Sequence, residues 1–205
     1  MILTEIGEVG VHLGDQTYVL RPSLYAMSQL GEPSGIVEIY ASLMSEPVAL
    51  RDRREQFRNA LAVVHACSDT DLSDVFGYIN ERMKYVVKKA SMNDVLVLGR
   101  HLIQHGITGV LPPLPRRHDD DGEYSDEFNA RDHVATAVAH LGMTEREAWS
   151  MTMTSLVGAL RSKYPPAPSN APGSRAPSAE EHDATMDWHD RILAKKRAKL
   201  NKEQG

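Results

Sequence analysis

The first residues that could carry chemistry are His101 and His105, four positions apart in a stretch with a helical pattern. This spacing places two imidazoles on one face of a helix, where they could ligate a metal ion. The glutamate that accompanies the histidines of zinc hydrolases is missing, and no cysteine is near in sequence. The pattern therefore favours an exposed helix edge, and we predict no metal site.

A second candidate is the pair His65 and Cys67, because a thiol beside an imidazole can act as a nucleophile. Such a pair needs a third group to orient the imidazole, and none is evident. The chain also shows no Gly-rich phosphate-binding loop, no nucleophile elbow and no CxxC motif. We therefore predict that Cys67 is an inert thiol and that the protein is not an enzyme and needs no cofactor.

The acidic run at residues 119–123 suggests calcium only superficially. An EF-hand loop that began at Asp119 would require glycine at the position that Tyr124 occupies. Leucines and prolines precede the run, and this composition cannot form a helix. We predict an exposed loop over residues 107–127.

Positive charge is densest at residues 191–202, which hold six lysines and arginines. Such a segment could contact phosphate groups. However, no aromatic residues alternate with these cations, and the whole chain carries a formal net charge of −5. A solvated helix end is favoured over nucleic acid binding, and a DNA-binding or regulatory protein stays the alternative.

The elements that position these residues belong to a chain of 205 residues with an ordinary composition, 41% hydrophobic and 25% charged. The N-terminus lacks the basic and apolar segments of a secretory signal, and no apolar run reaches about 18 residues. The single cysteine cannot form an intramolecular disulfide. We expect a soluble cytoplasmic protein that does not span a membrane.

The predicted fold is mainly α with a small N-terminal β-hairpin. Residues 9–13 alternate apolar side chains with small or polar ones, and a turn at Gly14 would return a second strand, so residues 1–21 should form the hairpin. Ser23 can cap the first helix, and helical patterns continue over residues 23–106.

Caps and apolar stripes mark the individual helices of this region. Pro33 suits a first helical turn, and Pro47 is expected to begin a long helix. A further helix is expected over residues 69–79, and another from Ser91 to Gly106.

Residues 128–164 should complete the globular domain, which spans residues 1–164. The five prolines of residues 165–177 predict a linker, because almost nothing there can be buried. Residues 178–205 form a charged segment with an acidic start and a basic end, which complements the dipole of a helix. Such a polar helix is expected to gain order from a partner.

Residues 141–164 predict two short helices separated by a polar step. Thr144 and Glu147 have the spacing of a capping box, and Gly142 suits the left-handed position that ends the helix before them. Thr152 can cap the second helix. These helices carry apolar side chains around Trp149 and no catalytic group.

The Leu-Gly-Met-Thr turn at residues 141–144, followed by Trp149, a Met-Thr step and a short helix, resembles a family of proteins. A second stretch, residues 14–27, has the pattern Gly-Asp-x-x-Tyr-x-Leu-Arg-Pro-Ser-Leu-x-Ala-Met. Both stretches are similar to the tail assembly chaperones of long-tailed bacteriophages and related gene-transfer particles. That family usually has an acidic residue in the first helix, where this chain has Ser28 and Gln29.

The resemblance implies a chaperone of the host cytoplasm that binds the tape-measure protein, keeps it soluble, recruits the major tail-tube protein and is absent from the mature virion. A tape measure is a long helix with an apolar stripe, and a groove between helices could cover it. Self-association and a minor structural role in the tail are left open. The side chains expected to contact the partner are Trp149, Met151, Met153, Leu156, Leu160, Trp188 and Ile192.

Overall fold

The computed structural model describes residues 1–112, 125–165, 183, 186–189 and 191–192. Contacts divide the chain into two units, Met1–Pro165 and Pro166–Gly205. The first unit is mainly helical with a small antiparallel hairpin near its N-terminus, so the predicted fold class is confirmed. No helix among the described residues is both long enough and apolar enough to cross a membrane.

The N-terminal hairpin follows a short 3-10 turn, η1 (Thr4–Ile6), and consists of β1 (Val9–Leu13) and β2 (Gln16–Leu20). Leu13 pairs with Gln16, so the loop has two residues, and its first residue, Gly14, has a φ of 58°. A glycine at this position suits the tight turns that match the twist of a hairpin. Leu20, at the end of β2, is fully buried and joins the hairpin to the helical core.

Two helices follow the hairpin, α1 (Leu24–Ser28) and α2 (Pro33–Met44). The Ser23 hydroxyl accepts a hydrogen bond of 3.1 Å from the backbone N–H of Ala26, as its capping role requires. Pro33 occupies the first turn of α2, where a missing N–H costs nothing. Both of these predictions are confirmed.

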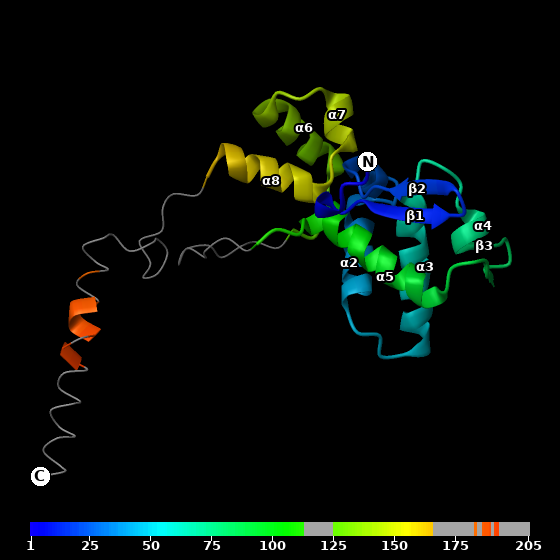
Figure 1. Ribbon diagram of the computed structural model, residues 1–205. Coiled ribbons are helices and arrows are strands. Elements are labelled where there is room, and N and C mark those ends of the chain that lie inside the picture. Colours follow the sequence, from blue (N-terminus) through cyan, green and yellow to red (C-terminus); the bar gives the residue numbers. More distant parts are fainter. Residues whose placement is uncertain (113–124, 166–182, 184–185, 190, 193–205) are drawn as a thin grey trace, which may run out of the picture. The chain divides into compact units, whose positions relative to one another are not determined.

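The centre of the domain is the contact between α3 (Leu50–Ala66) and α5 (Met92–Ile103), with α2 beside them (Figure 1). Gly99 of α5 lies directly on Ala60 of α3, and a Cβ at Gly99 would come within 2.6 Å of the Ala60 Cβ. The two backbones can therefore approach closely. The helix α3 begins at Leu50 rather than at Pro47, because the Asp52 carboxylate accepts the N–H groups just before the first turn.

The expected helix over residues 69–79 is the main error in the prediction. The structure has one helical turn, α4 (Ser73–Phe76), and then a second small hairpin of β3 (Tyr78–Ile79) and β4 (Tyr85–Val86). The helix ends at Gly77, whose φ is 78° and whose missing Cβ leaves room for the Val86 carbonyl oxygen. A side chain at that position would collide with β4, so the chain must turn there.

The helix α5 does not end at Gly106 but continues as a π-helix, η2 (Gln104–Thr108), and the chain turns at Gly109. After the gap in the described residues come α6 (Ala130–Leu141), α7 (Glu145–Ser150) and α8 (Met153–Lys163). The predicted capping box at Thr144, the left-handed Gly142 and the cap at Thr152 are all confirmed.

In the second unit, the described residues 183, 186–189 and 191–192 are helical, and an ion pair of 4.0 Å joins Asp187 to Arg191. The predicted acidic loop at 119–123, most of the linker at 165–177 and most of the charged segment at 178–205 lie outside the described residues.

Candidate functional site

Two segments that are far apart in the sequence meet where α1 and α7 lie together. The backbone N–H of Leu24 donates a 2.8 Å hydrogen bond to the Met151 carbonyl oxygen, and Ser23 forms an isolated antiparallel bridge with Thr152. Leu24 and Thr152 are fully buried. Direct backbone hydrogen bonds therefore hold the start of α1 against the step between α7 and α8.

This junction presents an aromatic pair, Tyr25 and Trp149, on the surface. The two rings meet edge to face with centroids 6.4 Å apart, an arrangement that the ring quadrupoles favour. Tyr25 is 58% exposed and Trp149 is partly buried, and the indole N–H donates a 3.3 Å hydrogen bond to the Glu145 carboxylate. Trp149 is therefore partly exposed to solvent, and its ring is held in place by Tyr25 and Glu145. We call Tyr25, Trp149 and Arg146 the aromatic surface.

The aromatic surface separates two hollows. One, of about 720 Å³, extends from the pair past Arg21 to the end of α3, and the other, of about 580 Å³, lies beside Ser28 and Glu145. Arg146 contributes to both. Arg21 is held in place by a 2.6 Å ion pair with the buried carboxylate of Glu8. The hollow beside Ser28 and Glu145 is mainly apolar, whereas the hollow toward Arg21 is lined largely by polar side chains.

A buried polar contact lies at the start of α8, the helix that follows α7. The Thr154 hydroxyl lies 2.8 Å from Nδ1 of His105 and accepts a 3.1 Å hydrogen bond from the backbone N–H of Val110. It thereby joins the start of α8 to η2. Burial, with the charge of His101 second, holds the pKa of His105 below its ordinary value. The prediction of an exposed edge is wrong for His105, which is 7% exposed.

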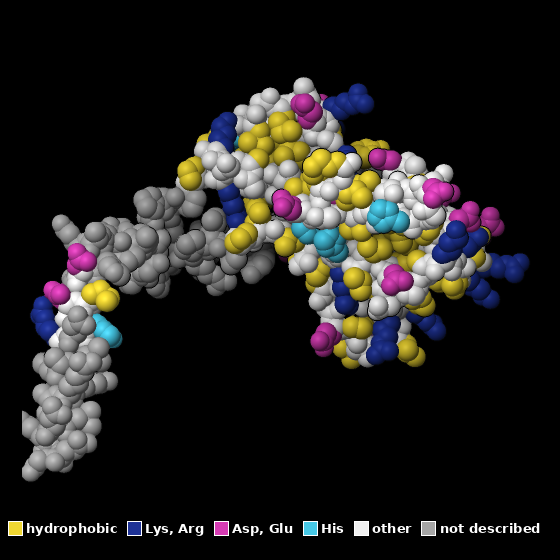
Figure 2. Space-filling view, in the orientation of Figure 1, with side chains coloured by type: hydrophobic (Ala, Val, Ile, Leu, Met, Phe, Trp, Pro, Cys, Tyr) yellow, Lys and Arg dark blue, Asp and Glu magenta, His cyan; other side chains and the backbone are white. Residues whose placement is uncertain are grey.

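The structure brings only part of the predicted contact set to the surface. Met153 and Leu156 are buried in the core, because the face of α8 that carries them packs against the rest of the domain, so they cannot touch a partner. Met151 and Leu160 are partly buried against the core. Figure 2 shows hydrophobic side chains gathered over α6 and α8, the helices that carry the partly exposed Leu160 and the exposed Val138.

The two predicted contacts in the second unit remain available. Trp188 is 62% exposed, and Ile192 is partly buried. Both lie in its helical residues. A tryptophan with this exposure is unusual on a surface that contacts nothing, since its large apolar area stays in water.

The other candidate residues are placed by ordinary structural contacts. His65 pairs through Nε2 with the Gly77 carbonyl oxygen at 2.9 Å, beyond the last turn of α3. Cys67 is buried, as predicted, and burial raises the pKa of its thiol far above the usual range, which disfavours the reactive thiolate. The described residues include no cluster of three or more side chains that could hold a metal ion.

Tyr25 is the surface residue that the sequence analysis missed. Its neighbours Leu24 and Met27 follow the apolar stripe of α1 and are buried, and Tyr25 stands off that stripe. A large aromatic side chain on the polar side of a short helix is the signal that could have identified it.

These features define a mainly helical protein with an exposed aromatic pair flanked by two hollows. The chain belongs to a family of unknown function (DUF6246), whose model matches residues 49–184. The matched region includes Trp149 and begins after Tyr25. Comparisons with curated proteins and with solved structures gave no match.

Proposed function

We propose that this protein is a phage tail assembly chaperone that binds the tape-measure protein, keeps it soluble and recruits subunits of the tail tube. One observation carries the proposal. The two stretches that resemble such chaperones, residues 14–27 and 141–164, lie against each other and together form the aromatic surface. Each stretch supplies one ring of the Tyr25–Trp149 pair.

The physical logic is that of a helix in a groove. A tape-measure helix exposes an apolar stripe with a side chain at every third or fourth position, and it aggregates unless that stripe is covered. Tyrosine and tryptophan offer a large contact area and lose little conformational freedom on binding. The mainly apolar hollow beside Ser28 and Glu145 can accept a neighbouring side chain of the stripe, and the more polar hollow toward Arg21 can accept a polar side chain at the edge of the stripe.

The direct test is co-expression with the tape-measure protein from the same genome. We expect more soluble tape measure when the wild-type chain is co-expressed. In a binding titration, Trp149→Ala or Tyr25→Ala should lower the affinity of the chain for the tape measure about thirtyfold, as for a typical hot spot. Tyr164→Ala is the matched control. It removes an exposed aromatic ring from the same domain, and that ring packs on His140 instead of the aromatic surface.

Two outcomes would contradict the proposal. The first is a tape measure that stays equally insoluble with and without the chain. The second is an equal loss of affinity in Tyr164→Ala and Trp149→Ala. Circular dichroism of each variant keeps a folding defect separate from a binding defect. Mass spectrometry of purified particles distinguishes a chaperone that leaves the tail, as we propose, from a minor structural protein that stays in it.

A further inference from the structure

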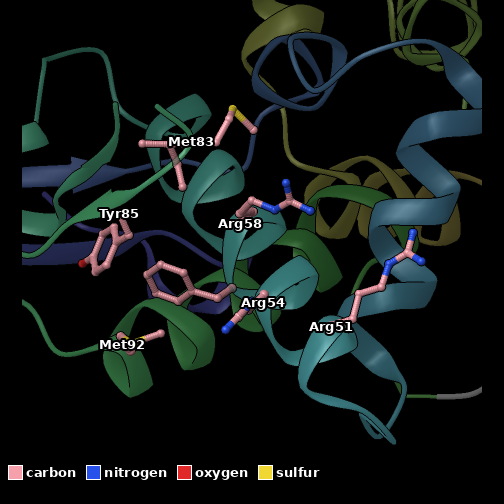
Figure 3. A pocket seen from close by; sticks show the side chains of 8 residues that line it. Arg51, Arg54, Arg58, Met83, Tyr85 and Met92 are labelled. Atoms are coloured by element: carbon pink, nitrogen blue, oxygen red, sulfur yellow. The ribbon is translucent and has the colours of Figure 1, made fainter. Parts of the chain in front are cut away.

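Another pocket, of about 450 Å³, lies on α3 next to the small hairpin β3–β4 and the start of α5 (Figure 3). Arg51, Arg54 and Arg58 project from α3, and Tyr85 and Met92 lie across from Arg54 (Figure 3). We call this the arginine pocket. The full set of residues around it is Arg51, Arg54, Phe57, Arg58, Ile79, Met83, Tyr85 and Met92.

The charge of the pocket has one sign and is not neutralised within the described residues. No acidic side chain lines it, and none of its three arginines forms a described ion pair or side-chain hydrogen bond. The arginines follow one another at intervals of three and four residues, so their Cα atoms lie along one face of α3 over about 10 Å, with the Arg54 side chain directed toward Met92 (Figure 3). The nearby Asp52 carboxylate is already used at the start of the helix.

The floor of the pocket is apolar and adaptable. Phe57 is buried and meets the Tyr85 ring edge to face, with centroids 4.6 Å apart. The Tyr85 hydroxyl donates a 2.7 Å hydrogen bond to the Phe76 carbonyl oxygen, which fixes its ring. Met83 and Met92, in contrast, are largely exposed at the rim. Flexible thioethers of this kind adjust to differently shaped apolar side chains.

The exposure of Met83 is maintained by an unfavourable backbone conformation. Met83 has a φ of 56°, and it is the one non-glycine among the described residues in the left-handed region. The Asn80 side chain accepts 3.0 Å hydrogen bonds from the N–H groups of Arg82 and Lys84, and the Met83 N–H donates to the Asn80 carbonyl oxygen. The turn therefore holds a large apolar side chain in solvent, at some cost in strain.

We propose that the arginine pocket binds an acidic amphipathic helix of a partner protein, with one apolar side chain on the Phe57–Tyr85 floor and a row of carboxylates on the three arginines. Carboxylates at matching intervals along a helix spread over the same distance as the arginines, and guanidinium groups pair well with them. A single phosphate would engage only part of that row. The inference stands independently of the chaperone proposal, because the two surfaces share no residue.

The test uses the full-length chain and a fluorescent helical peptide of about 15 residues, with glutamates at the spacing of the arginines and one leucine beside them. We expect binding that weakens as salt is raised from about 50 to about 300 mM. The double variant Arg54→Ala/Arg58→Ala should lower the affinity about tenfold, at the upper end for two exposed ion pairs.

The control is Arg53→Ala, which removes one positive charge from the same helix at an exposed position that does not line the pocket. Its affinity should stay within about twofold of wild type. The inference fails if Arg53→Ala weakens binding as much as the double variant does, or if a peptide with glutamine in place of glutamate binds equally well. Tighter binding of a thymidine oligonucleotide of similar length would also overturn it, in favour of nucleic acid.

Discussion

The aromatic surface and the arginine pocket differ in what lies beneath them. The Tyr25–Trp149 pair sits on segments joined by a backbone hydrogen bond and an isolated bridge, and the contact between Thr154 and His105 joins the next helix, α8, to η2. The arginines of the second site project from a single helix, and the opposite wall is a hairpin with only two residues in each strand. The segments that carry the aromatic surface are therefore also part of the packed core. The arginines of the arginine pocket, in contrast, project from the outer face of one helix.

This difference separates two kinds of mutational effect. Changes under the aromatic surface should alter the free energy of unfolding first and binding second. Changes in the arginine pocket should alter binding with little effect on stability, because exposed charges contribute little to it.

The largest effect is expected for Leu156→Ala in α8, the helix that follows the Trp149 helix. Leu156 is 1% exposed, so truncation leaves a cavity in the core. We expect the free energy of unfolding to fall by about 2–5 kcal/mol in a urea titration. Arg58→Ala, in the arginine pocket, should change it by less than about 0.5 kcal/mol. A small effect of Leu156→Ala would show that α8 is not part of the core, and the contrast would then fail.

A smaller effect is expected for Thr154→Val, which keeps the shape of the side chain and removes its hydroxyl. The variant leaves the Val110 N–H and Nδ1 of His105 without this partner. Loss of a hydrogen bond that leaves buried groups unpaired costs about 1–3 kcal/mol. Thr136→Val is a suitable control, because the Thr136 hydroxyl is exposed and bonds only within α6. Equal melting temperatures for the two variants would contradict the prediction.

The caps of the helices could be predicted because their signals are local. Ser23, Thr144 and Thr152 each bond to a backbone N–H three residues away, so sequence spacing is sufficient to find them. The second hairpin was missed for the opposite reason. A short apolar run such as Tyr85–Val86 is compatible with either helix or strand, and the contact of Gly77 with β4 decides between them.

The candidate site was only partly predictable. Trp149 stood out as a lone tryptophan, but its aromatic partner Tyr25 is brought to it by contacts between distant segments. Helical spacing alone could not tell that Leu156 faces inward. The row of arginines on α3 is visible in the sequence, but it becomes a pocket only because β3 and β4 form a wall where a helix was expected.

A still smaller effect, of opposite sign, is expected for Met83→Gly at the rim of the arginine pocket. Glycine relieves the left-handed strain at this position, and it also raises the entropy of the unfolded chain. The protein should therefore be unchanged or stabilised by up to about 1 kcal/mol, while the acidic peptide binds more weakly. Thermal melting and peptide titration of one sample measure both. A clear loss of stability would mean that Met83 belongs to the core, and the contrast between the two sites would disappear.

The smallest effect is a dependence on pH. We expect it in binding at the aromatic surface and not in peptide binding to the arginine pocket. Burial holds the pKa of His105 below its ordinary value of 6.5, so the unfolded chain binds a proton that the folded protein does not. The contribution of neutral His105 to the free energy of unfolding is fully present above the ordinary pKa of 6.5. It is lost as the pH falls toward the lowered pKa of the folded protein. The pKa of His133 is also lowered by burial, against the opposing charge of Asp132, and contributes in the same direction.

The melting temperature should accordingly fall from about pH 7.5 to about pH 5.5, and less so in His105→Gln, which can still bond to Thr154. His133→Gln gives the separate contribution of the second histidine. When His105 is protonated, its Nδ1 can no longer accept a hydrogen bond from the Thr154 hydroxyl. We therefore expect tape-measure binding to weaken over the same pH range. The arginines stay charged throughout, and peptide binding to their pocket should not change. A parallel loss of both activities would indicate that the two sites are coupled through the fold, because no histidine lines the arginine pocket.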